Sequence, residues 1–204
     1  MLKILVTGFE PFGGERVNPS WEAVKLLPSE IGGAEIIKAL LPTEFTGAEE
    51  ALLSAINKYE PHAVICTGQA AGRAAISFER VAINLRDAAI ADNAGFRPTD
   101  EAVIPGGQEA YFVTLPVKAM AAAVREAGLP SEISLSAGAY VCNDVLYTLL
   151  RRCKAENIPG GFVHLPLSKE QAESKEPQPP SMSIEDMAKA LRAAITVLAE
   201  QLSL

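Results

Sequence analysis

Short apolar runs alternate along the chain with longer segments in which apolar residues recur every three or four positions. The short runs predict strands, and the longer segments predict helices. This alternation is typical of an α/β domain with helices on both faces of a mostly parallel sheet. We expect the strands at Lys3–Thr7, Glu35–Leu41, Ala63–Thr67, part of Ile76–Leu85, Glu132–Ser136 and Gly161–Leu165.

Three helices have recognisable starts or ends. Asn18 is expected to cap the first helix, with Pro19 at its first position, where a missing N–H group is harmless. Thr46–Glu49 predicts a capping box for the second helix, which should stop before Pro61. The last helix should follow Ser183 and pack on the core through an apolar stripe of Ile184, Met187, Leu191, Ile195, Leu198 and Leu202.

Two stretches interrupt this rhythm. Residues 87–107 are polar, contain Pro98 and Pro105, and form too long a segment for a simple connection, so we expect a functional or interface loop. Residues 168–180 are charged and rich in proline. We expect them to form an exposed loop of low intrinsic order, and their position just after His164 suggests a mobile lid.

Composition excludes several classes of protein. The chain has 204 residues, of which 49% are hydrophobic and 21% charged, so we expect one globular domain over residues 1–204. The net charge of −7 and the lack of a basic stripe argue against nucleic-acid binding. The longest apolar stretches are far shorter than the roughly 20 residues that a membrane helix needs. We therefore expect no membrane insertion.

The spacing of the cysteines and histidines argues against disulfides and metal sites. Cys66, Cys142 and Cys153 form no CxxC pair, and no signal-peptide pattern opens the chain, so we expect a cytoplasmic protein without disulfides. His62 and His164 lie far apart, without metal-ligand spacing. We therefore expect neither a metal nor another cofactor.

Cys142 begins a helical pattern and has two interpretations. It is either a small core residue, since free cysteines are often buried, or a nucleophile. Ser136–Ala139 leads out of a predicted strand, which places Cys142 in the first helical turn. There the N–H dipoles stabilise a thiolate and lower the pKa of the thiol. The pattern alone leaves both interpretations open.

His164 lies at the carboxyl end of a predicted strand, directly before Pro166 and at the edge where α/β sheets place their sites. It is either a hydrogen-bonded core histidine or the base that a Cys–His mechanism needs. His62 follows Pro61 at the opposite end of a strand and is expected at the surface. Cys66 lies within an apolar run and is expected in the core.

Glu79 is a carboxylate in an otherwise apolar, strand-like run. It is either solvated on the outer face, paired with Arg73 or Arg80, or placed to orient the histidine. Nothing in the spacing decides between these alternatives.

The glycine-rich loop Gly8–Gly14 follows the first strand, as phosphate-binding loops do, but it matches neither GxGxxG nor GxxxxGK[ST]. Its two aromatic residues are Phe9 and Phe12. They either present their faces to a flat, uncharged ligand group or pack over the edge of the sheet.

Together these motifs closely resemble the pyroglutamyl peptidase I family, also called pyrrolidone carboxyl peptidases. The resemblance covers nearly the whole chain. It rests on seven blocks in order: GFEPFGG from Gly8, NPSWE from Asn18, TGQAAGR from Thr67, ERVAIN from Glu79, SAGAYVCN from Ser136, GGFVHLP from Gly160 and PPSM from Pro179.

The resemblance implies a single-domain, three-layer α/β/α sandwich with a mostly parallel twisted sheet, assembled as a homotetramer. It also implies a cysteine peptidase that removes N-terminal pyroglutamyl (5-oxoprolyl) residues from peptides through a thioester. By the same resemblance, Cys142 is the nucleophile, His164 is the general base and acid, and Glu79 orients His164.

The resemblance further implies a substrate pocket in which Phe9 and Phe12 supply aromatic faces and Gln69 supplies an amide. The chain departs from the family pattern at Ala89 and Ala91, where an arginine and a proline are usual. These departures bear on catalytic efficiency more than on the type of reaction.

Two other functions compete with this interpretation. One is a catalytically impaired homologue that still binds pyroglutamyl groups; the intact Cys142, His164 and Glu79 argue against it. The other is a nucleoside- or phosphate-binding α/β enzyme, suggested by the fold class and the glycine-rich loop. The lack of a lysine in that loop argues against the second.

Overall fold

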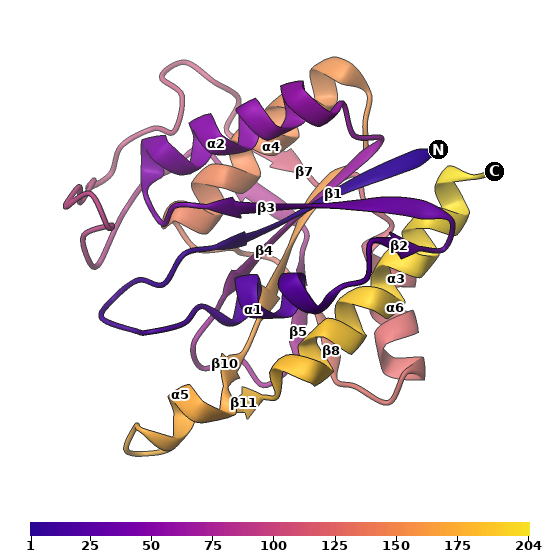
Figure 1. Ribbon diagram of the computed structural model, residues 1–204. Helices are drawn as coiled ribbons and strands as arrows, with labels where there is room; N and C mark the ends of the chain where they lie inside the picture. The colour runs from indigo at the N-terminus through magenta and orange to yellow at the C-terminus, as the bar shows by residue number, and fades with distance from the viewer.

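A seven-stranded sheet runs through the centre of the computed structural model, which describes residues 1–204 (Figure 1). Its strands are β1 (Leu2–Phe9), β2 (Glu30–Ile31), β3 (Ala34–Leu41), β4 (Ala63–Gln69), β5 (Ile76–Glu79), β8 (Ser131–Ser134) and β9 (Gly160–Leu165). Their order is β2-β3-β1-β4-β9-β5-β8. Four neighbouring pairs are parallel, and only β2–β3 and β5–β9 are antiparallel. The mostly parallel sheet is therefore confirmed.

Helices cover both faces of this sheet. Five helices do so: α1 (Pro19–Leu26), α2 (Phe45–Tyr59), α3 (Val117–Glu126), α4 (Val141–Glu156) and α6 (Ile184–Leu202). The short helix α5 (Lys169–Glu173) lies away from the main sheet (Figure 1). The helices α2 and α4 pack together on one face, and α1, α3 and α6 pack on the other (Figure 1). This arrangement is the predicted three-layer α/β/α sandwich. None of the helices is apolar over a length that would cross a membrane.

Two small sheets flank the main one. The hairpin of β6 (Val81–Ile83) and β7 (Ala110–Phe112) is antiparallel, and β10 (Leu167–Ser168) pairs in parallel with β11 (Ser181–Met182). The sequence pattern did not predict β7, β10 or β11, because strands of two or three residues leave almost no periodic signal.

The core explains why the apolar runs form central strands. Ile4, Leu5 and Val6 are consecutive and all fully buried, as expected for a strand that is covered on both faces. At the end of β1, a Cβ atom on Gly8 would lie 2.6 Å from the Cα atom of Trp21. Only glycine therefore allows α1 to pack so closely against the strand that leads into the glycine-rich loop.

The predicted caps of the first and last helices are confirmed. The side chain of Asn18 accepts a hydrogen bond from the N–H group of Ser20, and Pro19 opens α1. Ser183 accepts one from the N–H group of Asp186 and opens α6. Both helices thus begin where a local side chain satisfies a backbone donor that has no helical partner.

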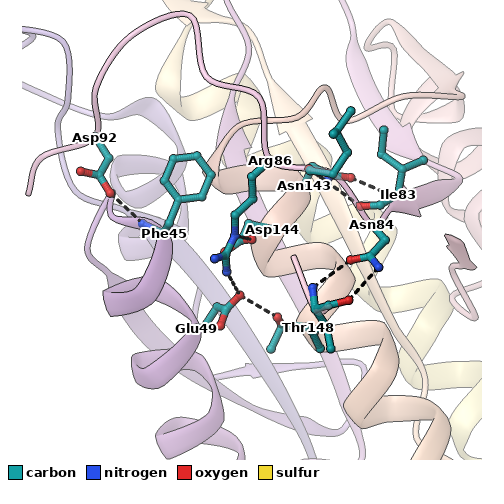
Figure 2. A network of polar contacts seen from close by, with 11 residues as sticks. Phe45, Glu49, Ile83, Asn84, Arg86, Asp92, Asn143, Asp144 and Thr148 are labelled. Atoms are coloured by element: carbon teal, nitrogen blue, oxygen red, sulfur yellow. Dashed lines mark hydrogen bonds and ion pairs between the residues drawn. The ribbon is translucent and has the colours of Figure 1, made fainter. Parts of the chain in front are cut away.

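The capping box predicted at Thr46–Glu49 is wrong. The helix α2 begins at Phe45, and no side chain at its N-cap position makes a cap hydrogen bond. Instead, the Oδ2 atom of Asp92 accepts a hydrogen bond from the N–H group of Phe45 at 2.9 Å (Figure 2). A carboxylate 47 residues away in the sequence replaces the local cap. The predicted end of this helix before Pro61 is confirmed, with Glu60 in the left-handed conformation.

The two irregular stretches differ from each other. Residues 87–107 contain no helix or strand, as expected for a loop, and an isolated bridge joins Glu101 to Arg86, directly before the segment. Residues 168–180 are not simply an exposed loop. They begin with the buried Ser168, which forms a capping box with Gln171 at the start of α5. This reciprocal pair of hydrogen bonds orders the segment where the sequence pattern predicted low order.

Candidate active site

The register of β9 determines which side chains surround His164. His164 lies opposite Gly68 of β4 and opposite Ser77 of β5, and Glu79 follows Ser77 by two residues. Opposed residues share a face of the sheet, as do residues two apart along a strand. Glu79 and His164 therefore project on the same side, and the Nδ1 atom of His164 lies 2.7 Å from Oε1 of Glu79.

Glu79 has two partners at one oxygen. The Nη1 atom of Arg73 donates a hydrogen bond to Oε1 at 2.7 Å, so the oxygen that contacts His164 also carries an ion pair. The carboxylate is completely buried, and its Oε2 atom has no hydrogen-bond partner. Two of the alternatives that the sequence left open for Glu79 therefore hold at once: the residue pairs with Arg73, and it also contacts the histidine. Arg80 takes no part.

Burial controls the charge of His164, which is only 3% exposed. It lowers the pKa of the imidazole, and the positive charge of Arg73 acts in the same direction, whereas Glu79 opposes both. The resting side chain is therefore neutral at neutral pH. With Nδ1–H directed at the carboxylate, the lone pair of Nε2 is left free to accept a proton.

Cys142 lies in the first turn of α4, as predicted, with Tyr140 at the N-cap position. Its sulfur packs against β4 at Gly68, where an added Cβ atom would lie 2.9 Å from Sγ. Gly68 is the direct partner of His164 in the pairing of β4 with β9, so the absence of a side chain at Gly68 lets the thiol lie against the strand next to the histidine. The structure thus gathers Cys142, His164 and Glu79 at one place.

The expected lowering of the Cys142 pKa is wrong. Cys142 keeps partial exposure, yet the apolar packing around it and the nearby charge of Glu79 raise the pKa of its thiol to about 12. Arg73 and the helix-start backbone lower this pKa, but their effect is smaller. Desolvation of a thiolate therefore outweighs the helix dipole here. The resting pair is a thiol beside a neutral imidazole.

The first turn of α4 is anchored by the two residues that follow the cysteine (Figure 2). The side chain of Asn143 accepts from the N–H group of Ile83 at 3.0 Å and donates to the carbonyl groups of Ile83 and Leu85. Asp144 binds the Nε atom of Arg86 at 2.5 Å. Sequence reasoning missed both residues, since only their position directly after Cys142 pointed to them.

A small pocket opens beside Cys142. Its lining carries no charged side chain and consists of Phe9, Phe12, Asn18, Thr43, Gln69, Tyr140, Val141 and Cys142. All three residues predicted to bind substrate therefore share a pocket with the candidate nucleophile. Sequence reasoning missed Tyr140 and Val141, although they precede Cys142, and it assigned Asn18 only a capping role.

The three predicted pocket residues differ in their surroundings. Phe9 is 2% exposed and packs against Phe162, so it serves the core as well as the pocket. Phe12 is half-buried, and its ring centroid lies 6.1 Å from that of Tyr140. The carboxamide oxygen of Gln69 accepts a hydrogen bond from Gln171 at 3.0 Å. This bond directs the Gln69 amide so that its NH₂ group remains available to a ligand.

The residues assigned to the surface and core lie outside this site. His62 is exposed and accepts a hydrogen bond from the N–H group of Lys3, and Cys66 is fully buried. Both assignments are confirmed. No group of three or more His, Cys, Asp or Glu side chains is placed to hold a metal ion.

Comparison with known proteins identifies the family. A family model described as pyroglutamyl peptidase matches residues 2–201. The chain belongs to the pyroglutamyl peptidase family. Pyrrolidone-carboxylate peptidase from Thermococcus kodakarensis is 52% identical over 99% of this chain and 98% of its own. The enzyme of the same name from Lactobacillus johnsonii is 48% identical over 98% of this chain and 94% of its own.

Solved structures of pyroglutamyl peptidases share the same fold. Pyroglutamyl peptidase I from Bacillus amyloliquefaciens is 42% identical, covers 98% of each chain and superimposes with a TM-score of 0.93. A variant of pyrrolidone carboxyl peptidase from Pyrococcus furiosus is 42% identical, with a TM-score of 0.95 over 98% of this chain and 100% of the other. As a member of the pyroglutamyl peptidase family, the chain is a hydrolase that acts on peptides.

Proposed function

We propose that the chain removes N-terminal pyroglutamyl residues from peptides by a thiol mechanism in which Cys142 is the nucleophile. The observation that carries this proposal is the uncharged pocket beside Cys142, which is lined by Phe9, Phe12 and Gln69. A nucleophile that forms part of the pocket wall can reach the acyl carbon of a group bound inside it. The family to which the chain belongs supports the same reaction.

In the first step, the Sγ atom of Cys142 attacks the carbonyl carbon that links the pyroglutamyl ring to the next residue. The Nε2 atom of His164 accepts the thiol proton as the S–C bond forms, because the resting thiol is protonated and the imidazole is neutral. Glu79 holds the Nδ1–H group and stabilises the imidazolium that results.

The negative charge that develops on the carbonyl oxygen must be stabilised by hydrogen-bond donors, and the start of α4 has free backbone N–H groups. The N–H groups of Asn143 and Asp144 both bind the carbonyl group of Tyr140. Those of Val141 and Cys142 lie in the first helical turn, where no helical carbonyl is available, so they supply the oxyanion contacts.

Collapse of the tetrahedral intermediate completes acyl transfer. The C–N bond breaks, the imidazolium of His164 donates its proton to the leaving amine, and a thioester to Cys142 remains. Water then attacks the thioester with His164 again as base. Free pyroglutamate leaves, and the thiol is restored.

The pocket favours a pyroglutamyl ring over a free amino terminus. The ring is flat and neutral, so it can lie against Phe12, while the NH₂ group of Gln69 donates to the lactam carbonyl. A residue with a free α-ammonium group would bring a positive charge into a pocket whose lining has no acid to pair with it. Burial of an unpaired charge is strongly unfavourable.

The direct test compares a chromogenic pyroglutamyl amide with the matching prolyl amide, which has an ammonium group and lacks the lactam carbonyl. We expect turnover of the first and at least about a hundredfold lower kcat/KM for the second. Alkylation by iodoacetamide should abolish turnover, with mass spectrometry locating the label on Cys142, since Cys66 and Cys153 are buried. Full activity after labelling of Cys142 would exclude the mechanism.

We infer that the enzyme is cytoplasmic, that it is one catalytic domain over residues 1–204 and that it assembles as a homotetramer. The pyroglutamyl-binding homologue without activity is the alternative, and the same turnover assay distinguishes the two.

A further inference from the structure

Arg73 reaches the candidate active site from the turn between β4 and β5, and it makes two contacts there. Its Nη1 atom donates to Oε1 of Glu79 at 2.7 Å, and its Nη2 atom donates to the carbonyl oxygen of Ser136 at 3.0 Å. The first contact touches the oxygen that binds His164. The second touches the loop between β8 and α4, six residues before Cys142.

The contact with Glu79 balances a buried charge. The carboxylate is completely buried, whereas the Arg73 side chain is 23% exposed and keeps contact with solvent. A buried carboxylate without a cation would draw a proton onto the neighbouring imidazole. Because Arg73 and His164 both bind Oε1, the guanidinium places a fixed positive charge next to the imidazole and opposes its protonation.

Through its contact with Ser136, Arg73 also binds the segment that leads to Cys142. The loop that contains Ser136 continues through Tyr140 into the first turn of α4. Arg73 therefore joins the strand that carries Glu79 to the segment that carries Cys142. A lysine could supply the charge at this position, but its single ammonium group lacks the forked geometry that reaches both partners.

We propose that Arg73 is a positioning residue of this peptidase, which keeps Glu79 directed at His164 and fixes the loop that leads to Cys142. This inference rests on the proposed roles of Cys142, His164 and Glu79. Arg73 contacts no reacting atom; it acts through Glu79 and through Ser136.

Other groups near His164 do not replace this effect. Among charged residues, Glu79 and Arg73 act on the imidazole. The nearby thiols of Cys142 in α4 and Cys66 in β4 have raised pKa values, because both are desolvated, and they therefore carry no charge at neutral pH. Glu132 of β8 accepts a hydrogen bond from the hydroxyl group of Ser77 at 2.7 Å and is exposed.

Titration of His164 by NMR tests the proposal, because the pKa of His164 would not change if Arg73 only stabilised the fold. The chain has only two histidines, so ¹³C-labelled histidine yields two Cε1–Hε1 signals, and the exposed His62 is an internal reference. We expect Arg73→Gln to raise the pKa of His164 by about one unit, since a neighbouring positive charge is removed. The acid limb of the kcat/KM profile should move to higher pH by the same amount.

Two further variants sharpen the test. Arg73→Lys should keep the His164 titration near that of the wild type but lower kcat/KM by at least about fivefold, because the forked contact is lost. Arg80→Gln is the matched control. Arg80 directly follows Glu79, but its guanidinium makes no hydrogen bond or ion pair, so the variant should behave as the wild type.

An unchanged titration of His164 in Arg73→Gln, or an equal shift in Arg80→Gln, would overturn the proposal. If circular dichroism shows that Arg73→Gln does not fold, Arg73→Lys decides, and wild-type kcat/KM in that variant contradicts the positioning role. The NMR titration needs no turnover. A failure of the proposed mechanism, seen as an active Cys142→Ser variant, is therefore distinguishable from a failure of the Arg73 proposal.

Discussion

His164 and Glu79 are 85 residues apart in the sequence, yet Nδ1 of His164 lies 2.7 Å from Oε1 of Glu79 in the folded chain. The contact depends on the antiparallel pairing of β5 with β9, which places Glu79 diagonally across from the histidine. Both side chains are buried, so the hydrogen bond is shielded from water. This shielding makes the pair suitable for holding one tautomer of a catalytic base.

Replacement of the candidate nucleophile is the first test. We expect Cys142→Ser to leave a folded protein with less than about a thousandth of wild-type kcat/KM, since a serine hydroxyl is a far poorer nucleophile in a site built for a thiol. Circular dichroism should verify the fold, and a chromogenic pyroglutamyl amide should report turnover. Cys153→Ser, at the far end of α4, is the control. More than a tenth of wild-type activity in Cys142→Ser would place the nucleophile elsewhere.

Removal of metal ions should not affect turnover. The structure offers no cluster of three or more metal-ligating side chains, and the proposed mechanism uses none. Enzyme dialysed against EDTA should therefore retain the kcat/KM of the untreated sample. Iodoacetamide treatment of the same dialysed sample should inhibit it, which shows that the assay still reports on Cys142. Loss of turnover after EDTA that zinc or another metal restores would contradict this expectation.

Phe12→Ala tests the aromatic wall of the pocket. Loss of the ring should weaken substrate binding by roughly 1–3 kcal/mol, which appears mainly as a raised KM. Phe112→Ala is a suitable control, because Phe112 is 69% exposed and does not line the pocket. Unchanged kcat/KM in Phe12→Ala would mean that the ring only packs against Tyr140.

Glu79→Gln tests the carboxylate. The amide keeps the size and a hydrogen-bonding oxygen but removes the charge that stabilises imidazolium, so kcat should fall at least about tenfold with little change in KM. The melting temperature should change little, since the packing volume is retained. Glu132→Gln removes a carboxylate from the neighbouring strand β8 and should leave kcat unchanged. A lowered melting temperature with wild-type kcat would assign Glu79 a structural role.

The polar network in Figure 2 predicts how stability depends on pH. Asp144 and Glu49 share the single guanidinium of Arg86, and Thr148 also binds Glu49. Burial, together with the charge of Glu49, raises the pKa of Asp144 to about 8, although Arg86 opposes the shift. The folded state therefore binds a proton that the unfolded chain, with a pKa of about 3.9, releases.

This contribution to stability is fully present below about pH 4 and is lost as the pH rises to about 8, with a slope of at most ~1.4 kcal/mol per pH unit. Urea unfolding between pH 5 and 8 should show the decline in the free energy of unfolding. Glu49→Gln removes one of the two carboxylates and should reduce the slope of the free energy of unfolding against pH. Glu50 is an exposed neighbour on the same helix, so Glu50→Gln should leave this slope unchanged. Equal slopes in wild type and Glu49→Gln would contradict the effect of Glu49 on the pKa of Asp144.

Several parts of the fold could be predicted from sequence because they depend on neighbouring residues. The six predicted strands are present, with ends that differ by a few residues, since an apolar run determines a strand through its own side chains. Asn18 and Ser183 cap their helices through donors two or three residues away. The motif around Cys142 indicated a helix start and a family for the same reason.

Other features could not be predicted, because they join segments that no local pattern relates. Asp92 caps α2 from a distant loop, and the predicted box at Thr46–Glu49 is not used. The short strands β10 and β11 and the helix α5 order a segment whose composition indicated a loop. In each case, a partner brought close by folding satisfies backbone groups that the local sequence leaves unpaired.

By itself, the sequence determined the α/β layering, the family and the set of candidate residues, since periodicity and motifs are properties of consecutive positions. Only the tertiary structure decided how those residues act on one another. It paired Glu79 with both Arg73 and His164, and it placed the Cys142 thiol against Gly68. It also reversed the expected pKa shift of that thiol. The physical reason is desolvation: the free energy of a charge depends on everything packed around it, and that packing exists only in the folded chain.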